Sequence, residues 1–338
     1  MIKLRYICLA LAATFIVSLS SCNQQAANNS TPNPAPTSQA QVQQDASHMH
    51  GGKKININSA ILSELDKLEA KLGIPALSNK IQAARPYASP EELVSKKVIT
   101  QEQFDQVKEM VTIEEIKLTG EAKDVDYMVK LGLMKGHLYV AKELLDQQKP
   151  KDAEPHIGHP VEEIYVDVEE QLNERKVPEF KTTLTKLQDL VKASGKADAI
   201  KTEFETSIKA VDSAIAALPA DQRSKTSFVL QVINGLLDTA NSEYGAAIAD
   251  GKVSAAIEYQ DSRGFVVYAR ELYKTISADM TKANGQVHKS IETNMTELAK
   301  AWPAVVPPAK PVKTTDEVTK LVKTIEKDTQ TVASASAK

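Results

Sequence analysis

The sequence predicts an all-α protein in which a small module of short helices precedes a larger bundle of long helices. Leu, Ile, Val and Ala dominate the apolar residues and stand beside many Lys and Glu, a composition typical of helical proteins. Helical periodicity covers most of the chain, and no convincing alternating pattern indicates a strand. Because the long helices are joined by short connections, we expect one or two up-and-down bundles.

The N-terminus carries the pattern of a secretory signal. Lys3 and Arg5 precede an apolar run from Tyr6 to Leu19, which is shorter than the ~20 residues that a bilayer-spanning helix needs. A charged start, a short apolar core and small residues at the exit are typical of a signal peptide. The four residues that end at Cys22 resemble a bacterial lipobox, and this resemblance implies cleavage before Cys22 and its acylation. An ordinary cleaved signal with an incidental cysteine is the alternative.

We therefore expect residues 1–21 to be a lipoprotein signal peptide. The mature protein is expected to be anchored by lipid in the cell envelope, outside the cytoplasm, at the periplasmic face or the cell surface. Residues 22–52 are predicted to form a lipidated, disordered tether, because their small and polar side chains bury too little surface to offset chain entropy. The only cysteines are Cys8, which leaves with the signal, and Cys22, so the mature body has neither a disulfide nor a thiolate metal site. A net charge of −3 gives no general attraction to nucleic acid or anionic lipid.

Residues 53–115 are predicted to form a module of four or five short helices. Ile55 to Asn58 indicate a short extended start, and Ser59 is expected to cap the first helix. Apolar residues at helical spacing follow, and Gly73 is expected to end this helix. Thr100 begins the capping box of the last helix.

The module contains segments that follow a known pattern. They are Ile55-Asn56-Ile57-Asn58-Ser59-Ala60, Glu64-Leu65, Leu72-Gly73-Ile74, Pro86-Tyr87, Glu92-Leu93 and Val111-Thr112-Ile113. They resemble the helix-hairpin-helix module of bacterial DNA-uptake (competence) receptors. With Pro75 to Ile81 and Ala84, they resemble still more closely the extrinsic helix-hairpin-helix protein of cyanobacterial photosystem II. The first resemblance implies DNA capture at the cell surface, and the second implies a scaffold subunit of a membrane complex.

The hairpin turns favour a protein partner over DNA. A DNA-binding hairpin presents backbone N–H groups to phosphate from a Gly-x-Gly turn. Gly73 keeps the first glycine, but the second is missing, and Val98 and Ile99 take the place of glycine in the second hairpin. Between Lys53 and Ile113, nine Lys or Arg stand against eight Asp or Glu, whereas phosphate binding needs unbalanced cations. DNA binding is the alternative, and its candidate phosphate contacts are Lys53, Lys54, Lys80, Lys96 and Lys97.

Residues 124–335 are predicted to form the helical-bundle domain. Helical patterns cover residues 126–148, 160–174, 178–193, 196–217, 223–250, 252–276, 278–301 and 315–333. Pro or Gly marks most of the breaks between them. Thr314 and Glu317 make a capping box for the last helix.

Two neighbouring segments of this domain carry candidate metal ligands. The candidates are His137, His156, His159, Glu162 and Glu163. His137 shares a helix face with apolar residues, so it is either a hydrogen-bonded core histidine or a ligand. His159 is expected at the N-cap of a helix that starts with Pro160. If that helix starts earlier, His156, His159 and Glu163 share one face.

Imidazole and carboxylate ligands suit zinc, copper or iron, so we expect a transition-metal site where these two helices meet. The alternative is that the acidic residues stabilise a helix N-terminus and the histidines satisfy a loop. The stretch from Gly158 to Glu162 resembles the His-x-x-Glu motif of imelysin-type helical-bundle proteins. That resemblance implies an association with iron uptake, with His159 and Glu162 as the corresponding residues.

A second polar cluster comprises Glu243, Tyr244, Glu258, Asp261 and Arg263. Glu258 and Asp261 lie one turn apart in a helix that is apolar elsewhere, and Glu243 and Tyr244 lie on the preceding helix, where they are able to face them. Such a set forms either an ion site or a buried salt-bridge network.

We expect no enzymatic activity, because the sequence contains no phosphate loop, nucleophile elbow or zinc-protease motif. The sequence therefore predicts a non-enzymatic cell-envelope lipoprotein. Its bundle is expected to bind a metal ion or a metal-bearing ligand, and its degenerate helix-hairpin-helix module to dock a partner. A surface DNA-binding protein of the uptake-receptor type and a scaffold subunit of a membrane complex are the alternatives.

Overall fold

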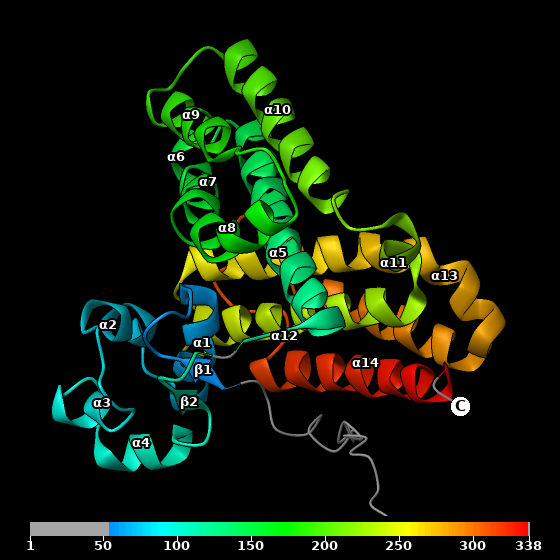
Figure 1. Cartoon of the computed structure of the whole chain (residues 1–338). Coiled ribbons are helices and arrows are strands. Elements are labelled where there is room, and N and C mark those ends of the chain that lie inside the picture. Colours follow the sequence, from blue (N-terminus) through cyan, green and yellow to red (C-terminus); the bar gives the residue numbers. More distant parts are fainter. Residues whose placement is uncertain (1–53, 116, 337–338) are drawn as a thin grey trace, which may run out of the picture. The chain divides into compact units, whose positions relative to one another are not determined.

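The computed structural model describes residues 54–115 and 117–336 (Figure 1). Helices dominate this part of the chain and its strands are two residues long, so the predicted all-α fold is confirmed. The predicted signal peptide (1–21), Cys22, the tether (22–52) and Lys53 lie outside the described residues. Among the helices described, none combines the length and the hydrophobicity that a bilayer span requires.

The helix-hairpin-helix module has a hydrophobic core of its own. Its elements are β1 (Ile55–Asn56), α1 (Leu62–Leu72), α2 (Leu77–Ala83), α3 (Glu92–Ser95), α4 (Gln101–Val107) and β2 (Val111–Thr112). β1 and β2 pair in parallel with Ile55 opposite Val111, so backbone hydrogen bonds join the two ends of the module. Gly73 ends α1 in the left-handed conformation, as expected, and Thr100 and Gln103 form the predicted capping box.

The start of α1 differs from the expectation. Ser59 does not cap the helix, because the chain turns there and α1 begins only after Ile61, which is extended. The side chain of Ile61 has no hydrogen-bond acceptor. Instead, Glu163 Oε2 of the bundle domain accepts a hydrogen bond from the Leu62 backbone N–H at 3.2 Å. The cap of α1 therefore comes from a distant part of the sequence.

The C-terminal part of the chain forms a four-helix bundle. It consists of α11 (Ala220–Ser224), α12 (Thr226–Ala247), the hairpin of β3 (Ile248–Ala249) and β4 (Lys252–Val253), α13 (Ala256–Ala299) and α14 (Thr315–Ser336). α13 supplies two of the four helices, because its backbone is non-helical at Asn284 and the chain reverses there (Figure 1). The Tyr273 hydroxyl accordingly lies 2.9 Å from His288 Nδ1. The sequence-based break near residue 277 was placed too early. Thr314 and Glu317 form the predicted capping box of α14.

A second group of helices consists of α5 and the shorter helices that pack against it. Its elements are α5 (Gly120–Asp146), α6 (Pro150–Ala153), α7 (Pro155–His159), the π-helix η2 (Pro160–Ile164), α8 (Tyr165–Glu174), α9 (Lys181–Lys192) and α10 (Ala197–Ile215). Side chains of both groups belong to one hydrophobic core. The long helices of the domain are therefore stabilised as one unit.

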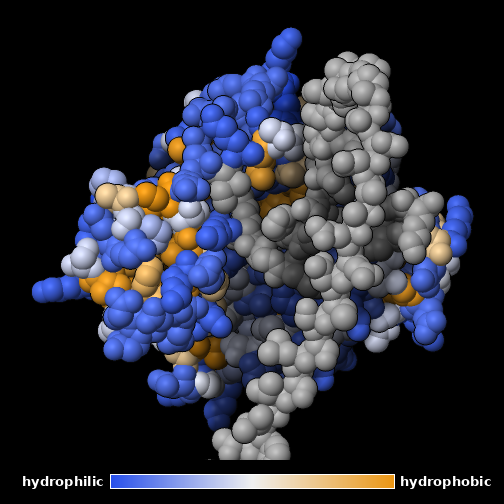
Figure 2. Space-filling model, turned by 60° about the horizontal axis from the view of Figure 1, so that its bottom comes forward, coloured by the Kyte–Doolittle hydropathy of each residue, from blue (hydrophilic) through white to orange (hydrophobic). Residues whose placement is uncertain are grey.

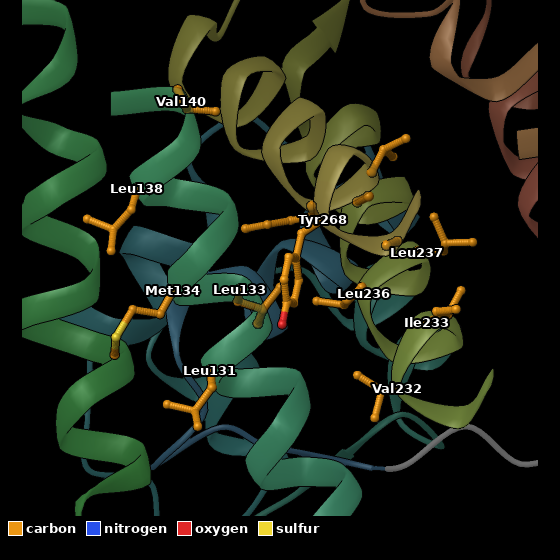
Figure 3. Packing of buried hydrophobic residues seen from close by; sticks show 14 of the residues in the cluster. Leu131, Leu133, Met134, Leu138, Val140, Val232, Ile233, Leu236, Leu237 and Tyr268 are labelled. Atoms are coloured by element: carbon orange, nitrogen blue, oxygen red, sulfur yellow. The ribbon is translucent and has the colours of Figure 1, made fainter. Parts of the chain in front are cut away.

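Small residues let α5 lie close to α13 and α12. A Cβ atom at Gly264 would overlap the carbonyl group of Gly136, so the backbones of α13 and α5 touch there. A Cβ atom at Gly132 would lie 2.9 Å from the ring of Tyr268. Figure 3 shows this ring between Leu133 of α5 and Leu236 of α12, whereas Leu131, Met134 and Leu138 point to the opposite side of α5. The close crossing brings polar residues next to these glycines into contact.

The module is docked on the bundle domain through α1, which packs against α12. Ile61 inserts into the core of the bundle domain. Lys67 of α1 forms an ion pair of 2.5 Å with Asp238 of α12, and Gly245 of α12 leaves room for Ala70. This interface covers one face of α1.

Candidate metal centre

Three buried side chains from three helices meet inside the bundle domain. His137 comes from α5, His156 from α7 and Asp261 from α13, and each is at most 2% exposed. Asp261 Oδ1 lies 2.7 Å from His137 Nδ1 and 2.6 Å from His156 Nδ1. One ligand atom of each residue lies within 4.8 Å of the other two. Two imidazoles and a carboxylate at this spacing form a candidate metal centre.

The helix that carries His156 starts earlier than a break at Pro160 implies. α7 begins with Pro155 at its first position. The chain stays helical past Pro160, because the following turn, η2, is a π-helix. His159 is thus the last residue of α7, and the prediction that it caps a new helix is wrong. The early-starting alternative applies instead: His156 and His159 lie one turn apart on α7. Single π turns of this kind are frequent at functional sites.

Gln260 fixes the orientation of the His156 ring. The Gln260 side-chain amide donates to the Val305 carbonyl at 3.2 Å, so its oxygen is left to accept from His156 Nε2 at 2.9 Å. His156 Nε2 therefore carries a proton, and Nδ1 faces Asp261 Oδ1. Two acceptors do not approach to 2.6 Å without a proton or a cation between them. A metal ion is able to take the place of that proton.

Within the described residues, neither ring nitrogen of His137 makes a hydrogen bond of good geometry, although the residue is 1% exposed. Asp261 Oδ1 is close to its Nδ1, but the oxygen does not lie along the direction of a ring N–H. Complete burial lowers the pKa of His137 despite the neighbouring Asp261. A buried, neutral and unpartnered imidazole costs free energy, and its free lone pair is the form that binds a metal.

The charges at the centre are unevenly distributed. Burial opposes ionisation of Asp261, but the neighbouring His137 and His156 hold its pKa well below the ordinary value. Burial also opposes protonation of His159, but a hydrogen bond to Asp261 and the charges of Asp261 and Glu163 raise its pKa to about 9. The Nδ1 atom of His159 lies 3.5 Å from Asp261 Oδ2. His159 thus contacts the oxygen that His137 and His156 leave free.

A polar chamber of about 220 Å³ adjoins the centre where the module meets the bundle domain. Its walls come from both, and they are formed by Leu62, Ser63, Asp66, Ser78, Asn79, His159, Glu163, Glu243, Ile257, Glu258 and Asp261. Asp261 belongs to the centre and also lines the chamber, and His159, which lines the chamber too, contacts Asp261. Burial raises the pKa of Glu163, Glu243 and Glu258 above the ordinary value of a glutamate.

One of the predicted ligands lies outside the centre. Glu162 is exposed and accepts a hydrogen bond from Gln188 Nε2 at 3.4 Å, because consecutive helical residues point to different faces. Glu163 faces the other way, lines the chamber and caps α1. Among the sequence-predicted ligands, the structure brings together His137, His156 and His159, with Glu163 beside them.

The second predicted cluster is divided by the fold. Glu243, Glu258 and Asp261 face the chamber. Arg263 instead pairs with Glu143 at 3.0 Å, and the Tyr244 hydroxyl donates to the Lys313 carbonyl at 2.7 Å. These two residues turn away because they lie on other faces of their helices. The sequence analysis placed the histidines and these acidic residues in two separate clusters. In the folded protein Asp261 belongs to both.

The sequence reasoning missed Asp66. It lies on α1 of the module, is 7% exposed and bonds to the Ser78 hydroxyl. An acidic residue in an amphipathic surface helix carries no sequence signal of burial. Only the docking of α1 on the bundle domain places Asp66 in the chamber wall.

The candidate phosphate-binding lysines are partly engaged within the module. Lys96 Nζ donates to the Ala84 carbonyl at 3.2 Å and lies 3.2 Å from Glu92. Lys54, Lys80 and Lys97 are exposed. Lys96 therefore has partners within the module, whereas the preference for a protein partner over DNA stays a prediction.

Comparison with known protein families supports this architecture. Residues 50–112 match the model of the helix-hairpin-helix motif, which confirms that module. Residues 219–336 match the model described as an iron permease-associated 4-helix bundle domain; they span α11 to α14 and carry Glu243, Glu258 and Asp261. No curated protein and no solved structure matches the chain. The chain thus combines a helix-hairpin-helix module with a helical bundle, of which the last four helices are similar to a domain associated with iron permeases.

Proposed function

We propose that this protein is a non-enzymatic, lipid-anchored protein of the cell envelope that binds a transition-metal ion between His137, His156 and Asp261. The observation that carries the proposal is the convergence of these three buried side chains, of which His137 makes no well-aligned hydrogen bond to any described residue. The lipid anchor and the envelope location rest on the sequence around Cys22.

The ligand atoms of His137, His156 and Asp261 suit a transition-metal ion. Two neutral imidazoles and one carboxylate are common ligands of iron, zinc and copper, and the Gln260 bond to His156 is the outer support that such ligands usually have. Iron is our first choice, because the matched four-helix model is described as iron permease-associated and Asp261 lies within the matched residues.

Metal titration of purified, untagged protein tests this function. We expect the wild-type protein to bind Fe²⁺ under anaerobic conditions, and metal at 100 times its Kd to stabilise the fold by about 2.7 kcal/mol. His137→Ala and His156→Ala should lose this binding. His288→Ala is the matched control, because His288 is bonded to Tyr273 away from the centre. Absence of bound Fe²⁺, Zn²⁺ and Cu²⁺ from the wild-type protein, or undiminished binding by His156→Ala, contradicts the proposal.

We infer that the helix-hairpin-helix module serves contacts with protein rather than with DNA. One face of α1 is already packed on α12, and Lys96 is engaged within the module. The face shown in Figure 2 is mostly hydrophilic, with small hydrophobic patches. Pull-down from solubilised membranes tests for a protein partner. A gel-shift complex with DNA that weakens steeply as salt rises supports the alternative instead.

A further inference from the structure

Close packing separates the imidazole ligands of the metal centre from solvent. His137 and His156 are 1% and 0% exposed. The ring of the buried Phe265 meets the His137 ring edge-on, with the centroids 5.1 Å apart, and Gln260 occupies His156 Nε2. Protein interiors contain few voids larger than a water molecule. An ion therefore reaches the centre only where a covering side chain is able to move.

Asp261 is the ligand residue that lies closest to an opening. It borders the chamber where the module meets the bundle domain. Its side chain is nevertheless only 3% exposed, so neighbouring side chains cover it on the chamber side as well. The residue that provides this cover controls access to the centre.

His159 lies in the position of such a cover. Its Nδ1 atom lies 3.5 Å from Asp261 Oδ2, and its ring meets the His137 ring edge-on, with the centroids 5.4 Å apart. The same side chain is 31% exposed and lines the chamber. The inner side of one imidazole thus contacts two of the three ligand residues, and its outer side contacts solvent.

His159 also has more freedom to move than the ligands beneath it. It is the last residue of α7, directly before the π turn η2. Exposed side chains change rotamer within nanoseconds, whereas tightly packed ones are held by their neighbours. Rotation of the His159 side chain uncovers Asp261 Oδ2 and requires no movement of a helix.

From this arrangement we propose that His159 is the gate of the metal centre. Its ring closes the path between solvent and Asp261, and its rotation admits and releases the ion. The inference rests on the proposed function and extends it from which residues hold the ion to how the ion enters and leaves. His159 acts here through the bulk of its ring and not as a ligand.

A gate has a kinetic signature that a ligand lacks. Entry and exit cross the same barrier, so removal of the gate accelerates both by the same factor and leaves the Kd unchanged. Loss of a ligand or of its outer support changes the Kd instead.

The rates of Fe²⁺ uptake and release under anaerobic conditions test the inference. Stopped-flow fluorescence of Trp302 follows uptake, because Trp302 is the one tryptophan in the sequence and its Nε1 donates to Ser262 Oγ, next to Asp261, at 2.7 Å. An excess of a coloured ferrous chelator measures release. We expect His159→Ala to accelerate both by about 10-fold or more, which corresponds to about 1.4 kcal/mol of barrier, with an unchanged Kd.

Two further variants separate the bulk of the ring from its nitrogens and from its place in the chain. His159→Phe keeps an aromatic ring but offers no nitrogen, so it should retain the slow rates of the wild-type protein. Glu162→Gln is the matched control, because Glu162 lies in the following turn but is exposed and bonds to Gln188. Its rates should equal those of the wild-type protein. Circular dichroism verifies that each variant is folded.

The outcomes separate this inference from the proposed function. A weaker Kd in His159→Ala with an unchanged rate of uptake identifies His159 as a ligand and overturns the gate. Wild-type rates of uptake and release in His159→Ala overturn it too. Both results leave the His137–His156–Asp261 centre standing, because the wild-type protein still binds Fe²⁺. Absence of metal from the wild-type protein overturns both.

Discussion

Gly136 of α5 and Gly264 of α13 lie in backbone contact, and each is close in sequence to a residue of the metal centre. His137 follows Gly136 directly, and Asp261 precedes Gly264 by less than one helical turn. A short aspartate side chain reaches the imidazole only because the two helix backbones touch. The geometry of the centre therefore depends on two residues that contribute no ligand atom.

Gly264→Ala is expected to destabilise the protein and disrupt the centre. The new methyl group would overlap the Gly136 carbonyl, and overpacking of this kind costs about 1–3 kcal/mol. Separation of the helices should also move Asp261 from His137 and weaken Fe²⁺ binding. Urea unfolding and metal titration measure the two effects.

Gly285→Ala is the control for that substitution. A Cβ atom at Gly285 has no neighbour within 4 Å, and Gly285 lies in the first turn of the helix that follows the break at Asn284, where alanine is tolerated at least as well as glycine. This variant should be as stable as the wild-type protein or slightly more stable, with unchanged metal binding. Equal behaviour of the two alanine variants would show that the helix contact is unimportant.

Gln260→Leu should weaken metal binding although Gln260 is not a ligand. The substitution leaves His156 Nε2–H and the Val305 carbonyl without their partner. Loss of such outer support typically lowers metal affinity by 10- to 100-fold, and the unpaired buried groups cost about 1–3 kcal/mol. Nitrogen NMR of the histidine rings should show that His156 no longer keeps its proton on Nε2. Gln260→Glu, which retains an acceptor for that N–H, should keep it there.

The metal-free protein should lose stability as the pH rises from about 4 to 7. Mainly through burial, the pKa of Asp66 is about 7 in the folded protein, whereas an unfolded aspartate titrates near 3.9. Between these values the folded state holds a proton that the unfolded state has released, so rising pH favours unfolding. The contribution is fully present below pH 4 and is lost as the pH passes 7, and it amounts to a few kcal/mol at about 1.4 kcal/mol per pKa unit.

Asp66→Asn removes this titration, so its stability should vary less across the same pH range. Urea unfolding at several pH values, with a chelator present, measures the slope. Asp238→Asn should keep the wild-type slope. A wild-type slope in Asp66→Asn would mean that other groups cause the pH dependence.

Glu163→Ala should loosen the start of α1. Glu163 accepts the hydrogen bond of the Leu62 N–H, and loss of a helix cap costs about 1 kcal/mol. Hydrogen exchange at Leu62 should become faster, whereas Glu163→Gln, which still offers an oxygen, should remain close to the wild-type rate. Thr314→Ala is the control, because it removes the cap of a different helix, α14. In this variant, exchange at Leu62 should stay at the wild-type rate. Unchanged exchange in Glu163→Ala would contradict the role of this carboxylate.

Much of the fold could be read from local sequence patterns. The capping boxes at Thr100 and Thr314 and the left-handed Gly73 depend on neighbouring residues only, so short-range rules predict them. The reversal of α13 was missed although Asn284-Gly285 is a local turn signal, in which Asn284 Oδ1 accepts a hydrogen bond from the Val287 N–H. The start of α1 depends instead on a contact with the distant Glu163, which caps it. Local patterns contain no information on such contacts.

The sequence by itself determined that this chain is helical and that His137, His156 and His159 are candidates for one site, because helical spacing and neighbouring helices are local properties. Tertiary structure alone decided which carboxylates join them. Asp261 replaces Glu162 because α5 and α13 touch at two glycines, and Asp66 enters the chamber because α1 docks on α12. Both choices depend on contacts between segments far apart in the chain, which no periodicity within a single helix encodes.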